Sequence, residues 1–279
     1  MKTYLDCIPC FFKQALSAAR EAGADEVQQK KILDEISSSV PKISYSLSPP
    51  YMSQIVYGSI RKITGVTDPF KEEKIKSNKL VLKLYPQLKE RIKQAKEPIK
   101  EAIKLAILGN TIDFGVPLGF NLEKELNSDN NFPIFDYGEF KNSLKKNSEV
   151  LYIADNCGET VFDRLLIEEM EKETIYAVRS APIINDATLE DAKFCGINEI
   201  AKVIPSGSEI AGTPLEICSQ EFLSLFNKIP FIISKGQGNY ETLSDEKTPI
   251  FFLLKAKCAI VAKDLNCNIG DMILKYNQK

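Results

Sequence analysis

The residues best suited to chemistry follow one apolar stretch near the middle of the chain. Residues 150–154 read Val-Leu-Tyr-Ile-Ala, and Asp155, Asn156 and Glu159 come directly after them in a short polar turn. Carboxylate and amide oxygens that converge on one point suit a hard divalent cation, and such a cation suits a phosphate. An Asp or Asn that only caps the following helix is the alternative for this turn taken alone. The turn therefore predicts either a metal-assisted phosphate site or a helix cap.

Two later apolar stretches also end in polar residues, one group rich in carboxylates and the other rich in glycine. The carboxyl ends of neighbouring parallel strands share one edge of a sheet, so we expect the three polar groups to meet there. Carboxylates at this edge would bind a metal ion, whereas cations and exposed backbone N–H groups would hold an anion. The residues are Arg179, Ser180 and residues 185–191 after the second stretch, and Lys235, Gly236, Gly238 and Glu241 after the third.

The elements that must position these residues alternate between strand and helix beyond residue 146. This alternation indicates βαβ units and a mostly parallel sheet sandwiched by helices, which is an α/β fold. The expected strands cover residues 150–154, 174–178, 201–204, 231–234, 250–254 and 258–262.

The first third of the chain has helical apolar spacing without alternating strands. Pro86 and Pro98 are expected to break or restart a long helical stretch, and Gly109 is expected to cap its end. The sequence shows no flexible linker. We therefore predict an all-helical N-terminal unit over residues 1–109, packed against a Rossmann-like catalytic unit over residues 110–279.

The composition is ordinary for a globular protein and excludes several classes of partner. Hydrophobic residues make up 44% and charged residues 27% of the 279 residues, and the net charge is −2. Lys and Glu are mixed along the chain, so no basic face indicates nucleic acid. No apolar run is long enough to cross a bilayer, and the N-terminus does not read as a signal peptide. We expect a cytoplasmic protein that binds neither nucleic acid nor membrane, and a homo-oligomer is compatible with the sequence.

Histidine is absent, which excludes every His-based catalytic triad and every His-ligated zinc centre. The seven cysteines are odd in number and scattered, which argues against a disulfide scaffold and for a reducing compartment. Cys7 and Cys10 form a C-x-x-C pair, for which two buried cysteines on a helix face are favoured over a redox pair. A structural zinc site would need two more ligands, and the absence of a second C-x-x-C and of His disfavours a four-cysteine zinc site without excluding it.

Residue spacing also excludes several familiar phosphate and nucleotide sites. The separation of Cys157 from Arg164 is too long for a cysteine-nucleophile phosphatase. An aspartyl-nucleophile phosphatase typically has a second Asp where this chain has Cys157. Gly236-x-Gly238 continues with Glu241 in place of the third glycine of a dinucleotide-binding motif, and no Walker lysine motif exists.

Several motifs spread along the chain form one joint pattern. They are Cys7-x-x-Cys10, Asp68-Pro69-Phe70, Gly109-Asn110-Thr-Ile-Asp113, Asp155-Asn156-x-Gly158-Glu159, the Asn-Asp-x-Thr-x-x-Asp of residues 185–191, and Lys235-Gly-Gln-Gly-Asn-x-Glu241. Together they resemble the damage-control phosphatase family, formerly catalogued as the domain of unknown function eighty-nine. The C-x-x-C pair is typical of the prokaryotic subgroup of that family. Each motif alone is weak, but the joint pattern is specific and covers nearly the whole chain.

The resemblance implies a divalent-metal-dependent phosphatase that acts on small phosphometabolites. It places the metal ligands on Asp155, Asn156 and Asp191, and the phosphate-contacting lysine on Lys235. The metal would be Mg²⁺, Mn²⁺, Co²⁺ or Ni²⁺, and Asp155 is expected on an exposed rim of the sheet. The candidate catalytic residues are Asp155, Lys235 and Asp113, and the candidate substrate-binding residues are Asn110, Glu159, Arg179, Ser180, Lys235 and Gly236.

Two other functions fit parts of the sequence. A related sheet could bind S-adenosylmethionine for methyl transfer to a carboxyl group, although no glycine-rich adenosyl loop follows the first expected strand. A non-enzymatic regulator could instead bind a metal ion or a sugar phosphate and use Cys7 and Cys10 as a redox switch.

Overall fold

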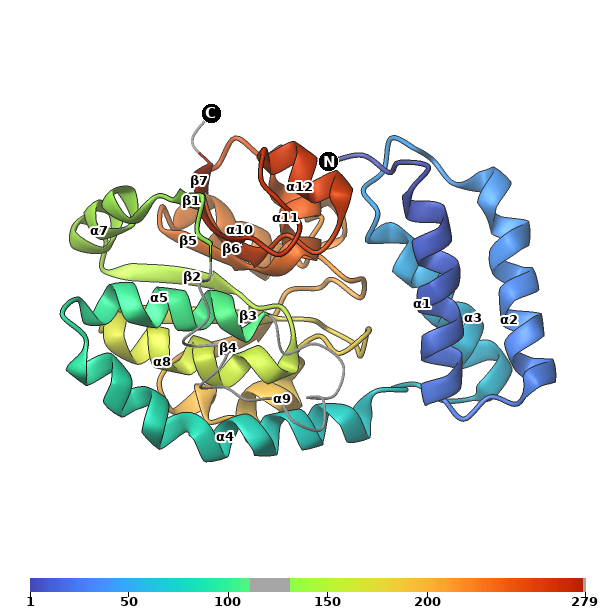
Figure 1. The fold of residues 1–279 in the computed structure, drawn as a ribbon, viewed down its shortest axis with the longest axis horizontal. Helices are drawn as coiled ribbons and strands as arrows, with labels where there is room; N and C mark the ends of the chain where they lie inside the picture. Colours follow the sequence, from blue (N-terminus) through green and yellow to red (C-terminus); the bar gives the residue numbers. More distant parts are fainter. Residues whose placement is uncertain (111–130, 278–279) are drawn as a thin grey trace.

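The computed structural model describes residues 1–110 and 131–277, and it contains a seven-stranded sheet with helices on both faces. Three N-terminal helices form a bundle beside this sandwich (Figure 1). The predicted α/β class, the mostly parallel sheet and the helical N-terminal region are confirmed. Among the described helices, none combines the length and the apolar character needed to cross a membrane.

The helices and strands have the following bounds. The helices are α1 (Cys7–Glu21), α2 (Glu26–Ser39), α3 (Tyr51–Thr64), α4 (Lys71–Gln94), α5 (Pro98–Gly109), α7 (Tyr137–Lys146), α8 (Thr160–Met170), α9 (Leu189–Phe194), α10 (Gln220–Lys228), α11 (Gly236–Leu243) and α12 (Ala259–Leu265). The strands are β1 (Ile134–Phe135), β2 (Glu149–Ile153), β3 (Glu173–Val178), β4 (Lys202–Pro205), β5 (Ile232–Lys235), β6 (Ile250–Lys255) and β7 (Met272–Asn277).

The order of the strands across the sheet determines where a ligand can bind. That order is β1-β7-β6-β5-β2-β3-β4, and all neighbouring pairs are parallel except β6 and β7. From β2 the chain moves to β3 and β4 on one side, and it then returns to build β5 and β6 on the other side. The order thus reverses between β2 and β5. Such a reversal opens a crevice beyond the carboxyl ends of the two strands.

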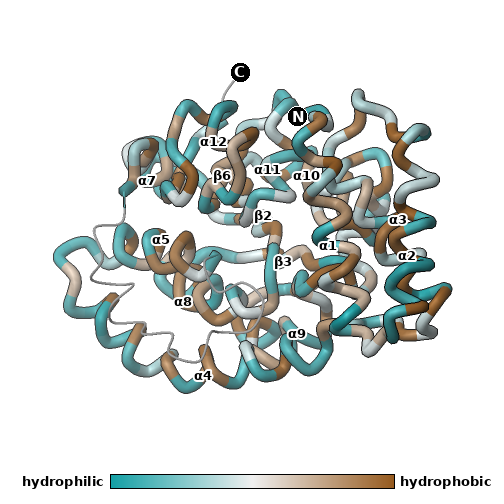
Figure 2. Tube along the Cα trace, turned by 45° about the vertical axis from the view of Figure 1, so that its right-hand side comes forward, coloured by the Kyte–Doolittle hydropathy of each residue, from teal (hydrophilic) through white to brown (hydrophobic). Residues whose placement is uncertain are grey.

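Alternate residues of the central strands pack on opposite layers of helices. Val150 and Tyr152 of β2 belong to a hydrophobic cluster with α4, α5, α8 and α9, whereas Leu151 and Ile153 pack with α10, α11 and α12. The hydrophobic stretches of α5 and α8 lie toward one another in Figure 2. Burial on both faces explains why these strands read as near-continuous apolar runs in the sequence.

The bundle of α1, α2 and α3 has a separate hydrophobic core. Ala15, Ala18 and Ala19 of α1 are fully buried in this core, where their small side chains allow close approach to α2 and α3. The hydrophobic residues of α4 and α5 pack instead against the sheet. The expected unit over residues 1–109 therefore contributes both to the bundle and to one layer of the sandwich.

The turn after β3 connects the sandwich to the bundle. Ile183 belongs to the hydrophobic core of the bundle, and Ile184 packs against the same core. Ile184 has a left-handed backbone conformation, with φ 47. A β-branched residue in this conformation is rare and strained, so the surrounding packing must hold it in place.

Some details of the predicted secondary structure are wrong. Residues 258–262 were expected as a strand, but residues 259–262 begin α12, in which Val261, Ala262 and Leu265 recur at helical spacing and are buried together. Strand β7 is absent from the expected strands because its apolar start is followed by the polar residues of its second half. Gly109 is the last residue of α5 rather than its cap. A Cβ there would lie 2.9 Å from the Phe162 ring, so glycine is needed for the close approach of α5 to α8.

Pro98 begins α5, as predicted, but Pro86 lies inside α4, which continues to Gln94. We expect Pro86→Ala to stabilise the protein, because proline in a helix removes one backbone hydrogen bond and crowds the preceding turn, at about 3 kcal/mol. Greater freedom of the unfolded alanine chain offsets part of that gain, which leaves on the order of 1–2 kcal/mol.

This gain would be measured as a rise in melting temperature of several degrees. Lys83→Ala, at another exposed position of α4, is the matched control and should leave the melting temperature nearly unchanged. A melting temperature of Pro86→Ala at or below that of the wild type would contradict the prediction.

Candidate functional site

Two chain segments lie very close together at the crevice between β2 and β5. Asp155 follows β2 and Gly236 follows β5, and Gly236 has φ +77. A Cβ at Gly236 would lie 1.7 Å from Oδ2 of Asp155, so any side chain there would displace the carboxylate. The expectation of an exposed rim is wrong, because Asp155 is only 7% exposed.

Two amide side chains hold the carboxylate of Asp155. Asn156 and Asn110 each donate a hydrogen bond to Oδ2, at 3.1 Å and 3.2 Å. Both amides also donate to Oε1 of Glu159, which is fully buried. Glu159 does not line the cavity described below, so its carboxylate orients the two amides from the side away from the cavity. The structure therefore brings together four of the predicted residues, Asn110, Asp155, Asn156 and Glu159.

Asp186 completes this group, although it was not among the predicted site residues. Asn156 and Asp186 form an isolated antiparallel β-bridge, and the backbone N–H of Ala187 donates to the carbonyl oxygen of Asp155 at 2.7 Å. These bonds fix the turn after β3 against the turn after β2. A signal was present in the sequence, since Asp186 belongs to the polar stretch of residues 185–191.

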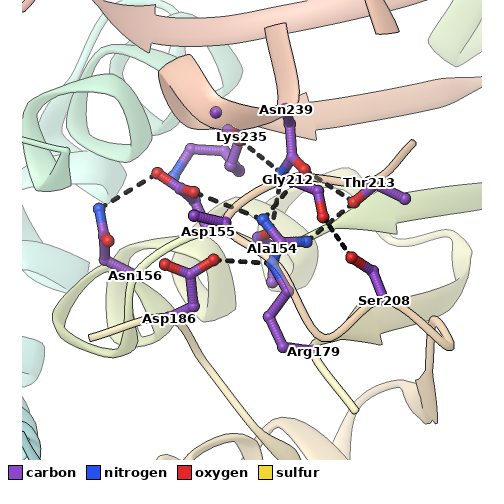
Figure 3. Close-up of polar contacts among 12 residues, drawn as sticks. Ala154, Asp155, Asn156, Arg179, Asp186, Ser208, Gly212, Thr213, Lys235 and Asn239 are labelled. Atoms are coloured by element: carbon purple, nitrogen blue, oxygen red, sulfur yellow. Dashed lines mark hydrogen bonds and ion pairs between the residues drawn. The ribbon is translucent and has the colours of Figure 1, made fainter. Parts of the chain in front are cut away.

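Arg179 contacts the carboxylates of Asp155 and Asp186 from the buried side of the site (Figure 3). Its guanidinium donates from Nε to Asp186 at 2.7 Å, and its Nη2 lies 3.7 Å from Oδ1 of Asp155. The remaining contacts are Nη1 to Thr213 at 2.8 Å and Nη2 to Asn239 at 3.0 Å. Because Arg179 is 1% exposed and outside the cavity lining, its role is to position the carboxylates.

Lys235 also points into the protein. Its ammonium is fully buried and lies 2.7 Å from Glu159 and 2.7 Å from Asp163. Asp163 accepts further hydrogen bonds from the hydroxyls of Tyr152 and Tyr176. Burial alone would lower the pKa of Lys235, but the two carboxylates raise it, so the lysine is charged.

The alternation of β5 explains this direction. Phe231 and Ile233 pack on the layer that contains α5 and α8, and Lys235 follows on the same face.

Ser180, another predicted substrate-binding residue, is exposed and lies outside the cavity lining. Its hydroxyl oxygen accepts a hydrogen bond from the backbone N–H of Gly207.

Asp191 lies in a different polar cluster. Its carboxylate pairs with Lys74 at 2.7 Å and accepts from the Thr188 hydroxyl at 2.8 Å, in a capping box at the start of α9. Asn78 of α4 donates to the same carboxylate at 3.3 Å. These contacts tie α4 to α9, and Asp191 does not line the cavity. Asp113, the other predicted catalytic carboxylate, lies outside the described residues.

The buried charges around the crevice do not cancel. The carboxylates are Asp155, Glu159, Asp163 and Asp186, and the cations are Arg179 and Lys235. Burial, followed by the charges of Asp186 and Glu159, raises the pKa of Asp155 well above its usual range. Burial raises the pKa of Asp186 to about 6. A divalent cation beside Asp155 and Asp186 would balance the two excess negative charges and favour their ionised forms.

A cavity of about 430 Å³ opens in front of these carboxylates. Its floor includes Asp155, Asn156 and Asp186, and its opposite wall comes from the bundle and the segment before α3. The remaining lining residues are Asp6, Cys7, Cys10, Phe11, Gln14, Pro49, Pro50, Ser53, Ile184, Asn185, Ala211, Gln237, Gly238, Glu241, Lys257, Cys258, Ala259 and Ile260. The volume suits a small metabolite.

The C-x-x-C pair lies at this cavity rather than in the core. Cys7 is half-buried and Cys10 is exposed, so the expectation of two buried cysteines is wrong. Burial of the sulfur raises the pKa of each thiol, and the charges of Glu241 and Cys258 raise both further. The fraction of reactive thiolate at neutral pH is therefore small.

The donor atoms at the cavity floor fit a hard divalent cation. Asp155, Asn156 and Asp186 offer carboxylate and amide oxygens, which suit Mg²⁺ or Mn²⁺ better than a soft metal. Over residues 1–110 and 131–277, no group of three or more His, Cys, Asp or Glu side chains is arranged for a metal ion. The fit therefore depends on the amide of Asn156 beside two carboxylates.

Comparison with known proteins agrees with the architecture. The model of the damage-control phosphatase ARMT1-like domain matches residues 3–273. A damage-control phosphatase of Pyrococcus horikoshii is 36% identical over 289 residues, covering 100% of this chain and 99% of the relative. One of Archaeoglobus fulgidus is 32% identical over 286 residues, covering 96% and 97%.

The structural comparison extends over the same length. The crystal structure of a DUF89 family protein from Pyrococcus horikoshii has a TM-score of 0.90 and 36% identity, and it covers 100% of both chains. The family model and the solved structure thus both match nearly the whole chain. The protein belongs to the damage-control phosphatase ARMT1-like family.

Proposed function

We propose that the protein is a divalent-metal-dependent hydrolase of small phosphoric monoesters. The observation that carries this proposal is the convergence of Asp155, Asn156 and Asp186 on one cavity at the switch between β2 and β5. Membership of a phosphatase family supports phosphate chemistry. The cavity volume supports a metabolite rather than a macromolecule as substrate.

Asp155, Asn156 and Asp186 would hold the metal ion. Asp186 takes the place that the resemblance assigned to Asp191, because Asp186 faces the cavity whereas Asp191 pairs with Lys74. A bound Mg²⁺, Mn²⁺, Co²⁺ or Ni²⁺ ion would act as a Lewis acid toward a phosphoryl oxygen. The charge excess of the buried site supports a divalent rather than a monovalent ion.

The surrounding residues would hold this arrangement in place before substrate binds. Arg179 fixes the orientation of Asp186, and the amides of Asn110 and Asn156 fix that of Asp155. Gly236 leaves the space that the carboxylate of Asp155 occupies. Such fixed groups lower the barrier of phosphoryl transfer mainly through position and electrostatics.

The cytoplasm is the compartment that we propose for this reaction. All seven cysteines are free thiols. Free thiols persist in the reducing environment of the cytoplasm.

Removal of the metal provides the first test. Treatment with EDTA should abolish phosphate release from a phosphoric monoester, and added Mg²⁺, Mn²⁺ or Co²⁺ should restore it, since all proposed ligands are oxygens. Inorganic phosphate would be measured directly, with the melting temperature recorded in parallel. Full activity of the metal-free protein would refute the proposal.

A comparison of two carboxylates tests which of them binds the metal. Asp186→Asn should reduce metal affinity and turnover strongly, and it should also lower the melting temperature, because the buried Arg179 is left with a weaker partner. Asp191→Asn should retain turnover but lower the melting temperature, because it leaves the buried Lys74 with a weaker partner. Metal titration by calorimetry would separate the two variants. The opposite result, with metal affinity lost only in Asp191→Asn, would assign the site to Asp191.

Lys235→Met tests the buried ion pairs. This change leaves Glu159 and Asp163 without their cation, and the loss of one partner of a buried pair costs ~3–5 kcal/mol of stability. A marked fall in the melting temperature is therefore expected along with loss of activity. Lys228→Met, at an exposed position of α10, is the control. A normal melting temperature with a specific loss of turnover would instead support direct contact between Lys235 and the phosphate.

The double variant Cys7→Ser with Cys10→Ser tests the redox alternative. Because both thiols have raised pKa values, we expect turnover to be nearly unchanged and hydrogen peroxide to affect wild type and variant alike. Phosphate release would be assayed before and after oxidation and after treatment with dithiothreitol. Reversible inactivation of the wild type alone would favour the redox regulator.

A further inference from the structure

Glu241 is a buried carboxyl group of the cavity that the proposed metal site does not use. It lies on α11, is 9% exposed and lines the cavity together with Asp155 and Asn156. Its Oε1 accepts a hydrogen bond from Nε2 of Gln237 at 2.8 Å. Within residues 1–110 and 131–277, Gln237 is the one hydrogen-bond donor to this carboxyl group. Oε2 of Glu241 is therefore left for a ligand in the cavity.

Helix α11 leads from the proposed metal site to Glu241. It begins at Gly236, beside the carboxylate of Asp155, and Glu241 lies about 7 Å further along the helix axis. Gln237 and Glu241 are one helical turn apart and share the face of α11 that lines the cavity. A metal–oxygen contact of about 2 Å, a phosphoryl group and a hydrogen bond of about 2.7 Å span a comparable distance. The ester oxygen of a substrate whose phosphate lies at the cavity floor can therefore reach Glu241.

The carboxyl group of Glu241 keeps its proton at a higher pH than an ordinary glutamate. Burial raises its pKa to about 7, although the hydrogen bond from Gln237 and the charge of the N-terminal amine act to lower it. The group is therefore protonated below about pH 7 and ionised above it. An acid with a pKa near neutral pH is suited to proton transfer. The titratable groups that line the cavity around it are Asp6, Cys7 and Cys10 at the start of the bundle, Asp155 and Asp186 of the floor, and Lys257 and Cys258 between β6 and α12.

We propose that Glu241 is the general acid that protonates the ester oxygen as the alcohol leaves. This inference rests on the proposed function. When the bond between phosphorus and the ester oxygen breaks, its electron pair stays on that oxygen. The carboxyl proton of Glu241 bonds to this pair, so the alcohol leaves uncharged. Water supplies the new oxygen on phosphorus together with both of its protons, which gives dihydrogen phosphate. That product returns one proton to the Glu241 carboxylate and leaves as hydrogen phosphate.

Ring-substituted phenyl phosphates test this role, because their leaving groups differ in basicity but little in size. p-Nitrophenolate is a stable anion that leaves without a proton, whereas the more basic phenolate leaves more easily as neutral phenol. Glu241→Gln retains an oxygen that can accept from Gln237 but cannot release a proton. With the metal-loaded full chain, we expect kcat/KM of the variant to fall roughly 100-fold for phenyl phosphate and less than about threefold for p-nitrophenyl phosphate.

The wild type alone provides a second measurement. The ratio of kcat/KM for phenyl phosphate to kcat/KM for p-nitrophenyl phosphate should fall as the pH rises through about 7, because Glu241 loses its proton there. Effects of pH on the metal site or on the phosphate group act on both esters and cancel in this ratio. In Glu241→Gln the ratio should be lower and independent of pH. A ratio that is independent of pH in the wild type would overturn the role of Glu241, even if the variant failed to fold.

Controls separate this role from general effects on the site. Glu139→Gln removes a carboxyl group from an exposed position of α7 and should leave both rate constants unchanged. Metal titration by calorimetry should give the same affinity for Glu241→Gln and wild type, since Glu241 is not a proposed ligand. An equal loss of rate for both esters, or no loss, would overturn the role of Glu241 while the proposed function stands. A wild type without metal-dependent hydrolysis of either ester would instead overturn the proposed function.

Discussion

The excess of negative charge buried between β2, β3 and β5 is the constraint on which the site depends. Carboxylates taken out of water repel one another and are costly unless cations or hydrogen bonds compensate them. Arg179 and Lys235 compensate part of this charge from the buried side of the site. The amides of Asn110 and Asn156 hold the carboxylate oxygens of Asp155 in place. The uncompensated part faces the cavity. A site built in this way is stable as a folded structure, and its remaining negative charge supports the proposed binding of a divalent cation.

The topology of the sheet explains why the charges gather at one point. Because the strand order reverses between β2 and β5, a crevice lies beyond the carboxyl ends of these two strands. The turn after β3 is bound to the turn after β2 through the bridge between Asn156 and Asp186. The bundle then closes the open side of the crevice. The sheet edge and the helices of the bundle therefore line the same cavity.

The sequence was sufficient for the fold class and for two of the residues that line the cavity. Strand alternation and polar residues after each strand identified the common edge on which Asp155 and Asn156 lie. Two ambiguities limited the rest. The spacing of residues 185–191 does not reveal which carboxylate faces the cavity, because that depends on how the turn folds back on β2. The apolar run at residues 258–262 is too short for its period to separate strand from helix.

The direction in which the Lys235 side chain points could have been predicted from the sequence. The two-residue period of β5 places it on the face of Phe231 and Ile233, toward α8, and Asp163 of α8 lies where it can pair with the lysine. The presence of Lys257 in the cavity lining could not be predicted in this way. Its position depends on a turn after β6 and on the bundle that forms the other side of the cavity, and no local period encodes that approach.

The strained backbone of Ile184 links the packing of the bundle thermodynamically to the turn that carries Asp186. Its left-handed conformation costs of order 1–3 kcal/mol and persists because its side chain packs against the hydrophobic core of α1–α3. Asp186 follows only two residues later, so the same turn carries both the strain and a proposed ligand. At the proposed site, metal affinity would thus include the free energy of keeping the bundle packed, and a bound ion would return an equal stabilisation to the bundle. Substitutions in the core of α1–α3, far from any ligand, would then change metal affinity without touching the ion.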